Sequence, residues 1–485
     1  MKGKALKWIT LFFTFIYPLT GFSQLSQTNT LIKDWVSQDI FKHTSIGIYM
    51  QDAKTGKEVA SYNSQRSLTP ASIQKLLTTA AALEMMGPDY RFSTNLGYNG
   101  KIKNDTLVGN LIILGGGDPA LGSMYFEDHY LKQSFLSAWT DSLASYHIRC
   151  IKGDIITDAT IYDDQDIPDS WVWEDLGNYY GAGTSGLTVY DNLFEIHFSS
   201  PSSAGQQTKI IAIAPEIPDL KFDNRVLSSD TLQDLSYVFG SPLDTRRIIR
   251  GTIPKGKANF IVKASVPDPA FLLARQFREI IKANGISVTG EIKKKEKTHG
   301  QEAVTILATT YSPPLTDIIR VTNYESVNLF AEHLLKHISY LHSGLGNTRE
   351  GTKLVVDFWK SKGIDTSGLF MCDGSGLSRF NAVTPRQMVA VLNYMKNKSP
   401  NSELFFRSLP AAPNGTLFYF NPANFPNEGL RAKSGSMTRV RSFAGILKTT
   451  SDREILFTVM LNNFSCSQHS AVSAIEKLLI NVSKY

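Results

Sequence analysis

The sequence predicts an α+β protein in which an antiparallel sheet is flanked by helices and interrupted by a large β-rich insertion. Segments with helical periodicity lie beside alternating strands near both ends of the chain, whereas the middle contains short strands separated by turn signals. With 485 residues, 42% of them hydrophobic, the chain is long enough for two or three domains with packed cores. We therefore expect the two ends to form one domain into which the middle is inserted.

The first 23 residues have the pattern of a secretory signal peptide. Three lysines precede an apolar run from Trp8 to Tyr17, and small residues follow at Gly21 and Ser23. We predict cleavage near Ser23–Gln24 and a mature chain that is periplasmic or otherwise extracytoplasmic. An uncleaved anchor is the alternative, although the apolar run is short for a bilayer. No cysteine follows the run, which argues against a lipoprotein.

The charge pattern argues against a nucleic-acid partner. Removal of the three lysines in the signal segment lowers the formal net charge from +6 to +3, because that segment has no acidic residue. Lys293–Lys295 lies between Glu291 and Glu296, which favours a solvated strand edge. The three cysteines are odd in number and far apart, which argues against a disulfide framework.

Residues 24–89 are predicted to form the first part of the sheet domain. A helical segment around Leu31–Val36 precedes a hairpin that turns at Lys54–Gly56. A helix follows from Thr69 to Met86 and ends at Gly87, which is followed by proline.

This helix places Ser72 and Lys75 on one face, one turn apart. Thr69 suits the N-cap and Pro70 the first helical position, so Ser72 lies in the first turn. Backbone N–H groups there are unpaired and the helix dipole is positive, which suits a nucleophile that needs an oxyanion site. The Ser-x-x-Lys spacing alone is common, so an accidental match is the alternative.

Residues 90–266 are predicted to form a β-rich accessory insertion of one or two small domains. Short strands alternate with Gly-rich turns throughout this segment. Residues 181–186 match G-x-G-x-x-G, but a strand rather than a helix follows them, so we expect no dinucleotide cofactor. None of the candidate catalytic residues lies in the insertion, and we expect its removal to spare them.

Residues 267–485 return to helices and strands and complete the sheet domain. Helices are predicted after Asp268, after Tyr324 and after Thr384, followed by two adjacent strands and an amphipathic C-terminal helix. His333 and His337 are four apart on a helix but lie in no HExxH pattern, so we interpret them as surface or packing residues and expect no metal.

Two further motifs turn Ser-x-x-Lys into a specific pattern. Ser326–Asn328 supplies Ser-x-Asn, and Lys433–Gly435 supplies Lys-Ser-Gly just before a strand. Ser-x-x-Lys, Ser-x-Asn and Lys-Ser/Thr-Gly occur in this order in penicillin-binding proteins and serine β-lactamases. The alternatives are an N-cap role for Ser326 and a surface turn for Lys-Ser-Gly. Asp373–Gly376 we interpret as only a tight loop.

The chain resembles the D-alanyl-D-alanine carboxypeptidase/endopeptidase family of class C low-molecular-mass penicillin-binding proteins, peptidase family S13. Besides the three motifs, GNLIILGGGDPAL, YYGAGTSGLTVYDN and CDGSGLSRFNAVTP are similar to segments typical of that family, over nearly the whole mature chain. The resemblance implies a transpeptidase/β-lactamase-like catalytic domain with an insertion between Ser72 and Ser326. Ser434 stands where Thr is commoner and Val327 where Asp is common, and both changes leave the catalytic assignment intact.

The motif residues carry the groups that peptide-bond acylation requires. Ser72 is the candidate nucleophile, and Lys75 is its base when neutral, a state favoured by the helix dipole and by the charge of Lys433. Ser326 relays a proton to the leaving amine. Asn328 orients Lys75 and holds the substrate's peptide group.

The Lys-Ser-Gly strand is the candidate substrate-binding element. Lys433 and the Ser434 hydroxyl offer a charge and a donor to the carboxylate of a terminal D-Ala, and Gly435 lies between them and Ser436. The resemblance implies an oxyanion hole made by the backbone N–H groups of Ser72 and Ser436.

We therefore expect an exported serine D,D-peptidase that acts on peptidoglycan stem peptides and needs no cofactor. It would hydrolyse D-Ala-D-Ala as a carboxypeptidase, and D-Ala–diamino-acid cross-links as an endopeptidase, with β-lactam antibiotics as covalent inhibitors. A β-lactamase is the first alternative, but the sequence shows no positioned glutamate for its deacylating water. A non-catalytic scaffold is the second, and it has no need of Ser72 and Lys75. The balance of activities and the oligomeric state stay open.

Overall fold

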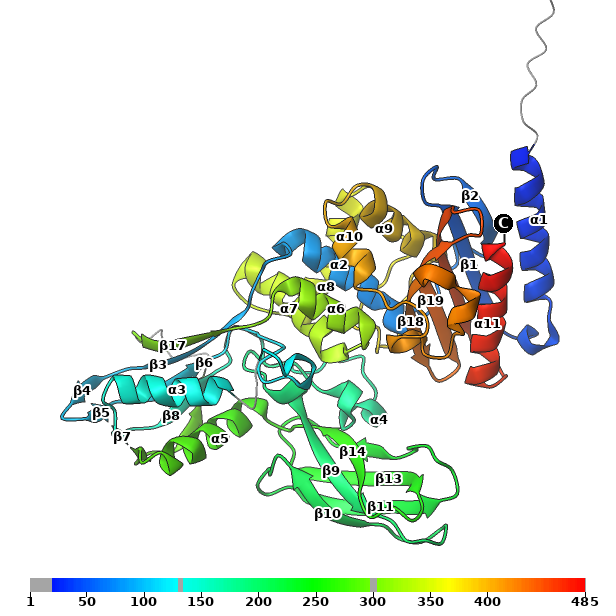
Figure 1. Ribbon diagram of the computed structural model, residues 1–485. Helices are drawn as coiled ribbons and strands as arrows, with labels where there is room; N and C mark the ends of the chain where they lie inside the picture. The colour runs from blue at the N-terminus through cyan, green and yellow to red at the C-terminus, as the bar shows by residue number, and fades with distance from the viewer. Residues whose placement is uncertain (1–19, 130–133, 297–302, 485) are drawn as a thin grey trace, which may run out of the picture.

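The computed structural model describes residues 20–129, 134–296 and 303–484 (Figure 1). Both ends of the chain contribute to an antiparallel five-stranded sheet with the order β18-β19-β20-β1-β2. Its strands are β1 (Ser45–Asp52), β2 (Glu58–Tyr62), β18 (Leu430–Met437), β19 (Val440–Lys448) and β20 (Glu454–Asn462). The predicted antiparallel sheet built from both ends of the chain is confirmed.

Two terminal helices cover one face of this sheet. The helices α1 (Thr20–Val36) and α11 (Gln468–Ser483) lie side by side there (Figure 1). The indole N–H of Trp35 donates to the carbonyl of Ala474 at 2.9 Å, and the apolar stripe of α11 is buried against the strands. This face has its own hydrophobic core, as the amphipathic pattern predicted.

A helical layer covers the other face and contains α2 at its centre. Its members are α2 (Lys75–Met86), α6 (Leu315–Tyr324), α7 (Asn328–Ser343), α8 (Thr348–Ser361), α9 (Pro385–Asn397) and α10 (Ser402–Arg407). Every residue of α2 from Lys75 to Leu83 is buried, although its two threonines and its lysine are polar. A helix that is buried on all sides must satisfy its polar groups inside the protein.

The start of this helix differs from the prediction. Thr69 is not the N-cap, since Pro70 holds that position and no side chain caps the turn. The Thr69 backbone N–H and carbonyl pair instead with the side-chain amide of Asn462 on β20, at 2.8 and 3.1 Å. A 3₁₀ turn, η2 (Ala71–Gln74), follows, and the α-helix begins only at Lys75. Ser72 therefore lies in a tight turn that leads into the helix. The predicted stop at Gly87 is confirmed, since this residue has a φ of +86°.

The inserted region forms two lobes, which Figure 1 shows beside the sheet domain. In the first, β4 (Lys101–Lys103), β5 (Thr106–Val108), β7 (Cys150–Lys152) and β15 (Ser287–Val288) form one sheet. A second sheet in that lobe contains β3 (Ser93–Tyr98), β6 (Leu111–Leu114), β8 (Ile155–Asp158), β16 (Ile292–Lys294) and β17 (Thr305–Tyr311). Helices α3 (Ser134–Ser145) and α5 (Pro269–Ala283) pack against these strands.

The second lobe has two three-stranded sheets with a hydrophobic core of their own. One sheet contains β9 (Leu193–Ser199), β10 (Lys209–Ala214) and β14 (Phe260–Ser265). The other contains β11 (Lys221–Ser229), β12 (Tyr237–Phe239) and β13 (Arg246–Pro254). Phe194, Ile196 and Phe198 alternate along β9 and are fully buried between the two sheets.

Strand pairing extends the insertion beyond the expected boundary at residue 266. The helix α5 packs on β8 and β16, and β17 runs antiparallel to β3, with Tyr311 opposite Ser93. The chain thus leaves the insertion beside the strand by which it entered. The sequence did not reveal this, because β17 is mostly exposed and its pairing partner lies about two hundred residues earlier.

The N-terminal prediction falls largely outside the described residues. The helix α1 begins at Thr20 and runs across the predicted cleavage site, Ser23–Gln24, while residues 1–19 are not described. In the described part of the chain, none of the helices has the length and hydropathy needed to cross a bilayer. The signal peptide stays a prediction.

Candidate active site

Ser72 and Lys75 meet at the junction of η2 and α2. Lys75 is fully buried, and its Nζ lies 3.1 Å from Ser72 Oγ, 2.5 Å from Asn328 Oδ1 and 2.8 Å from the carbonyl oxygen of Ser375. A neutral amine has two N–H donors and one lone pair. It can donate to Asn328 and Ser375 and direct its lone pair at the hydroxyl of Ser72.

The surroundings of Lys75 favour this neutral form. Burial lowers its pKa from 10.5 to about 7, and the charges of Asp373 and Glu332 oppose part of that fall. A substantial share of Lys75 is therefore unprotonated at neutral pH. A general base works best when its pKa lies near the operating pH.

Ser326 and Lys433 form the second half of the site. Lys433 Nζ donates to Ser326 Oγ at 2.9 Å and to the carbonyl of Ser434 at 2.8 Å. Burial holds the pKa of Lys433 well below its usual value, and the charges of Lys75 and Arg441 lower it further.

Ser326 does not cap α7: the N-cap is Val327, and Ser326 adopts a left-handed conformation with a φ of +64°. Such a conformation is costly for serine and is typical of functional sites.

Asn328 connects the sheet domain to the insertion. Its Oδ1 accepts from Lys75, and its Nδ2 donates at 2.8 Å to the carbonyl of Tyr180 in η5 (Tyr179–Gly181). Both ends of the amide are thus engaged, one by the candidate base and the other by the insertion.

The Lys-Ser-Gly motif lies on β18, the edge strand of the sheet. Lys433 and Ser434 are buried and Ser436 is exposed. A Cβ atom at Gly435 would lie 2.6 Å from the Pro70 carbonyl oxygen and 3.0 Å from the Ser72 backbone nitrogen, so only glycine lets the strand approach the turn that holds Ser72. The reading of this motif as a surface turn is wrong, because the motif is part of a strand.

All three motifs border one cavity of about 470 Å³. Ser72, Ser326, Asn328, Ser434 and Ser436 line it. The insertion supplies another part of the wall, which consists of Glu174, Asp175, Tyr179, Tyr180 and Tyr237. The insertion therefore contributes to the site, contrary to the expectation that it is a dispensable accessory.

Sequence reasoning missed a buried group behind Lys75. The loop Asp373–Gly376 was interpreted as only a tight turn, yet the Ser375 carbonyl accepts from Lys75 and the loop is anchored by Glu332 on α7. Glu332 lies four residues after Asn328, a spacing that places both on one side of a helix. That spacing was the available signal.

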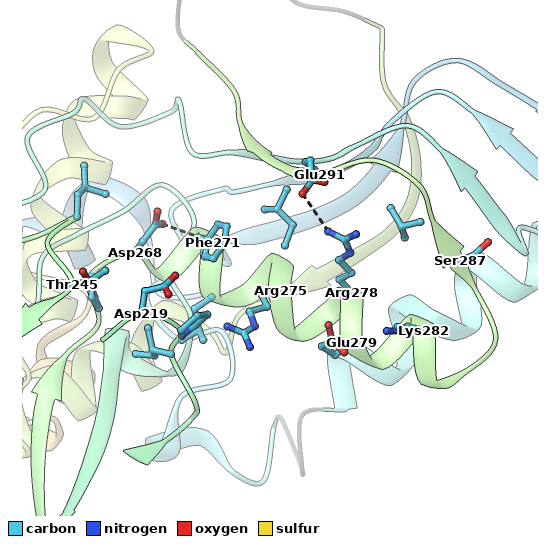
Figure 2. Close-up of a pocket in the computed structure, with 17 residues that line it drawn as sticks. Asp219, Thr245, Asp268, Phe271, Arg275, Arg278, Glu279, Lys282, Ser287 and Glu291 are labelled. Atoms are coloured by element: carbon cyan, nitrogen blue, oxygen red, sulfur yellow. Dashed lines mark hydrogen bonds and ion pairs between the residues drawn. The ribbon is translucent and has the colours of Figure 1, made fainter. Parts of the chain in front are cut away.

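A larger cavity, of about 680 Å³, lies along α5 in the insertion (Figure 2). None of the motif residues lines it. Arg278 and Glu291 face each other across part of it at 3.9 Å, and the Asp268 side chain caps α5. This cavity is separate from the candidate active site.

Comparisons with known proteins agree with this geometry. A model of the D-Ala-D-Ala carboxypeptidase 3 (S13) family matches residues 29–482. The D-alanyl-D-alanine carboxypeptidase of Actinomadura sp. (strain R39) is 29% identical over 431 residues, which cover 86% of this chain and 78% of that protein.

Two crystal structures of penicillin binding protein 4 (dacB) from Haemophilus influenzae are similar in fold. One has a TM-score of 0.80 and 24% identity, and covers 94% of this chain and 99% of the other. The second, complexed with a β-lactam, has a TM-score of 0.73 and 22% identity, and covers 96% and 99%. These similarities confirm the predicted fold class.

Proposed function

The chain belongs to the D-Ala-D-Ala carboxypeptidase 3 (S13) family and is a serine-type carboxypeptidase, and from this membership we propose that Ser72 is its acylated nucleophile. Peptidoglycan stem peptides that end in D-Ala-D-Ala are the proposed substrates. The observation that carries the proposal is the hydrogen-bonded contact of Lys75 with Ser72 and Asn328, beside the contact of Lys433 with Ser326.

Acylation begins when neutral Lys75 removes the hydroxyl proton of Ser72. The Ser72 oxygen forms a bond to the carbonyl carbon of the penultimate D-Ala, and the C–N bond to the terminal D-Ala breaks. Ser326 gives a proton to the departing nitrogen and is reprotonated by Lys433, whose Nζ lies 2.9 Å away. Lys75 passes the proton from Ser72 on to replace the one that Lys433 gave, so Lys75 is neutral again before deacylation. The proton that leaves Ser72 is thereby balanced by the one that the amine gains.

Deacylation reverses these roles with water as the nucleophile. Water gives one proton to Lys75 and bonds to the ester carbon, the bond from Ser72 Oγ to that carbon breaks, and Ser72 recovers its proton. The backbone N–H groups of Ser72 and Ser436 are the proposed oxyanion hole, a feature that typically lowers a barrier by about 3–4 kcal/mol. Support comes from the close approach of β18 to η2 at Gly435.

Lys433 and the Ser434 hydroxyl are the proposed anchors for the carboxylate of the terminal D-Ala. The unliganded site disfavours a charge on Lys433, because burial and neighbouring cations lower its pKa. The arriving carboxylate supplies the opposite charge that favours the protonated form. Substrate binding and protonation of Lys433 are therefore coupled.

We further propose endopeptidase activity and export. The same acylation cleaves a cross-link when the leaving amine belongs to a diamino acid rather than to D-Ala.

The proposal of export rests on the signal-peptide pattern and on the location of peptidoglycan outside the cytoplasmic membrane. N-terminal sequencing tests export: a mature chain starting near Gln24 supports it, and an intact Met1 form held in membranes contradicts it.

A labelling experiment tests the nucleophile. A β-lactam mimics acyl-D-Ala-D-Ala, and the related Haemophilus influenzae protein has been solved with one bound. Fluorescent penicillin should label the wild-type protein at Ser72 and should not label Ser72→Ala, whose fold circular dichroism should show to be intact. An adduct on another serine would refute the assignment. Masses of products from uncross-linked and cross-linked muropeptides then separate loss of alanine from cleavage of the bridge.

A further inference from the structure

Glu332 is a buried carboxylate directly behind the candidate base. It is 1% exposed and lies on α7, one turn after Asn328. Its oxygens accept from the backbone N–H of Gly374 at 3.0 and 3.1 Å and from that of Ser375 at 2.7 Å. Among the described residues no lysine or arginine forms an ion pair with this carboxylate, and a buried carboxylate without such a partner is costly.

Ser375 joins this carboxylate to Lys75. The backbone N–H of Ser375 donates to Glu332, and its carbonyl accepts from Lys75 Nζ at 2.8 Å. The position of that carbonyl therefore depends on the bond from Glu332 to the same residue. A displaced carbonyl would cost Lys75 one of the two acceptors that orient its lone pair toward Ser72.

Asp373 fixes the loop from the other side. It is fully buried and accepts four hydrogen bonds: from the backbone N–H of Gly376 and Ser378, the indole of Trp171 and the amide of Asn381, at 2.6–2.8 Å. These four donors fix the orientation of both carboxylate oxygens. Two carboxylates therefore fix the backbone of the Asp373–Gly376 loop: Glu332 from α7 and Asp373 from within the loop.

The other charges that act on Glu332 and Lys75 come from two places besides α2 and α7: Asp373 on the loop and Lys433 on β18. Arg441 on β19 acts on Lys433 only. Burial, and then the charge of Asp373, raise the pKa of Glu332 to about 7, close to that of Lys75.

We propose that Glu332 is a positioning residue for acylation: it holds the Ser375 carbonyl against Lys75, and its negative charge governs the pH at which Lys75 gives up its proton. This inference rests on the proposed role of Lys75 as the base. A negative charge near an ammonium group favours the protonated form. Loss of the Glu332 charge should therefore make Lys75 neutral at lower pH.

The test is the pH profile of the acylation rate constant in Glu332→Gln. Glutamine keeps the shape and an acceptor oxygen for the loop but carries no charge. The acid limb, where the rate rises as Lys75 loses its proton, should move to lower pH by roughly 0.5–1 unit relative to wild type. A merely structural role would lower the rate without moving the limb, and an unmoved limb overturns the proposal.

Two further variants separate charge from position. Glu332→Asp keeps the charge but withdraws the carboxylate by one methylene, so the limb should stay in place while the plateau rate falls about tenfold. Equal limb shifts in both Glu332 variants would overturn the charge argument. If Glu332→Gln does not fold, the plateau in Glu332→Asp decides, because an unchanged rate would refute positioning. Glu350→Gln on α8 removes a carboxylate bonded to Ser339 and Ser343, and its profile should match wild type.

The result also separates this inference from the proposed function. Failure of penicillin to label wild-type Ser72 would refute the function itself. Normal labelling with an unmoved acid limb in Glu332→Gln would refute only the role of Glu332.

Discussion

Two lysines of the active site and three lysines of the insertion lie in opposite settings. Lys75 and Lys433 are fully buried, and the hydrogen-bond partners of Lys75 are a hydroxyl, an amide oxygen and a backbone carbonyl, all uncharged. In the insertion, Lys293–Lys295 pair with Asp154, Asp268 and Asp158 at 2.7–2.8 Å. Burial lowers the pKa of Lys75 to about 7, whereas the ion pair with Asp154 raises the pKa of Lys293.

This difference shows what makes a lysine a base. The residue must be removed from water and must have neutral hydrogen-bond partners, since a directly paired carboxylate keeps the ammonium form. The three lysines of the insertion show the ordinary outcome, and Lys75 shows the exception. We expect the effects of substitution to decrease from the buried base, through the contacts that surround it, to the exposed lysines.

Replacement of the buried base should have the greatest effect. Lys75→Met fills a similar volume but carries no amine, so Ser72 loses its proton acceptor. The rate constant for penicillin acylation should fall by roughly 10²–10⁴-fold, as is typical for loss of a general base. Stopped-flow or gel-based labelling measures it. A rate within a few-fold of wild type would show that Lys75 is not the base.

Close approach of β18 to η2 can be tested at Gly435. In Gly435→Ala, the new Cβ would meet the Ser442 hydroxyl at 2.3 Å and the Pro70 carbonyl oxygen at 2.6 Å, so the strand must move away from Ser72. Acylation should slow by about 10–100-fold, because small displacements of reacting groups are expensive. Gly429→Ala, just before the same strand, is the control, since its Cβ would have no neighbour closer than 3.0 Å. Equal rates in the two variants would contradict the steric argument.

The free energy of unfolding should depend on pH because of two buried histidines beside the insertion. His333 and His337 on α7 are buried, and burial lowers the pKa of each to about 3. His333 contacts the Gly117 carbonyl and the Thr188 hydroxyl of the insertion, both at 3.0 Å. These histidines were expected on the surface or in packing contacts, and the structure places them in packing contacts.

Because the folded pKa lies below the unfolded value of about 6.5, the unfolded chain binds more protons between pH 6.5 and pH 3. The stabilisation is complete above pH 6.5 and is lost as the pH falls toward 3, by up to about 1.4 kcal/mol per unit for each histidine. Denaturant unfolding at pH 7, 6 and 5 measures this loss. His337→Gln should flatten the dependence, and an unchanged slope would contradict burial of a neutral imidazole.

The surface lysines should matter least. Lys293→Ala removes one exposed ion pair, and such pairs contribute little to stability, so the free energy of unfolding should stay close to that of wild type. Penicillin acylation should be unchanged. A large loss of either quantity would remove the contrast between the two regions.

The sequence predicted those parts of the site that are local in the chain. Ser72 and Lys75 are one turn apart, and Ser326 and Asn328 are two residues apart, so their motifs are visible without a structure. That the three motifs meet was inferred from the family resemblance, since spacing alone carries no information on tertiary contact. The spacing of Glu332 from Asn328 indicated a shared helix face, but its role was missed because its partner is a backbone loop, and backbone contacts have no residue signature.

Errors in the predicted fold have the same origin. Thr69 has the right residue type for an N-cap, but the side chain of Asn462, almost four hundred residues later, binds its backbone instead. The insertion was ended too early because β17 finds its partner, β3, only after the intervening lobes have formed. In both cases a distant contact outweighed a local preference.

The amide of Asn328 limits how such proteins can be recombined. Because its nitrogen is committed to the carbonyl of Tyr180, its oxygen is available to Lys75 in one orientation only. A chimera that exchanges the insertion for that of another family member would retain all three motifs, yet it would be active only if the new loop offers a carbonyl at this point. The insertion and the catalytic lysine are therefore linked through a single side-chain amide.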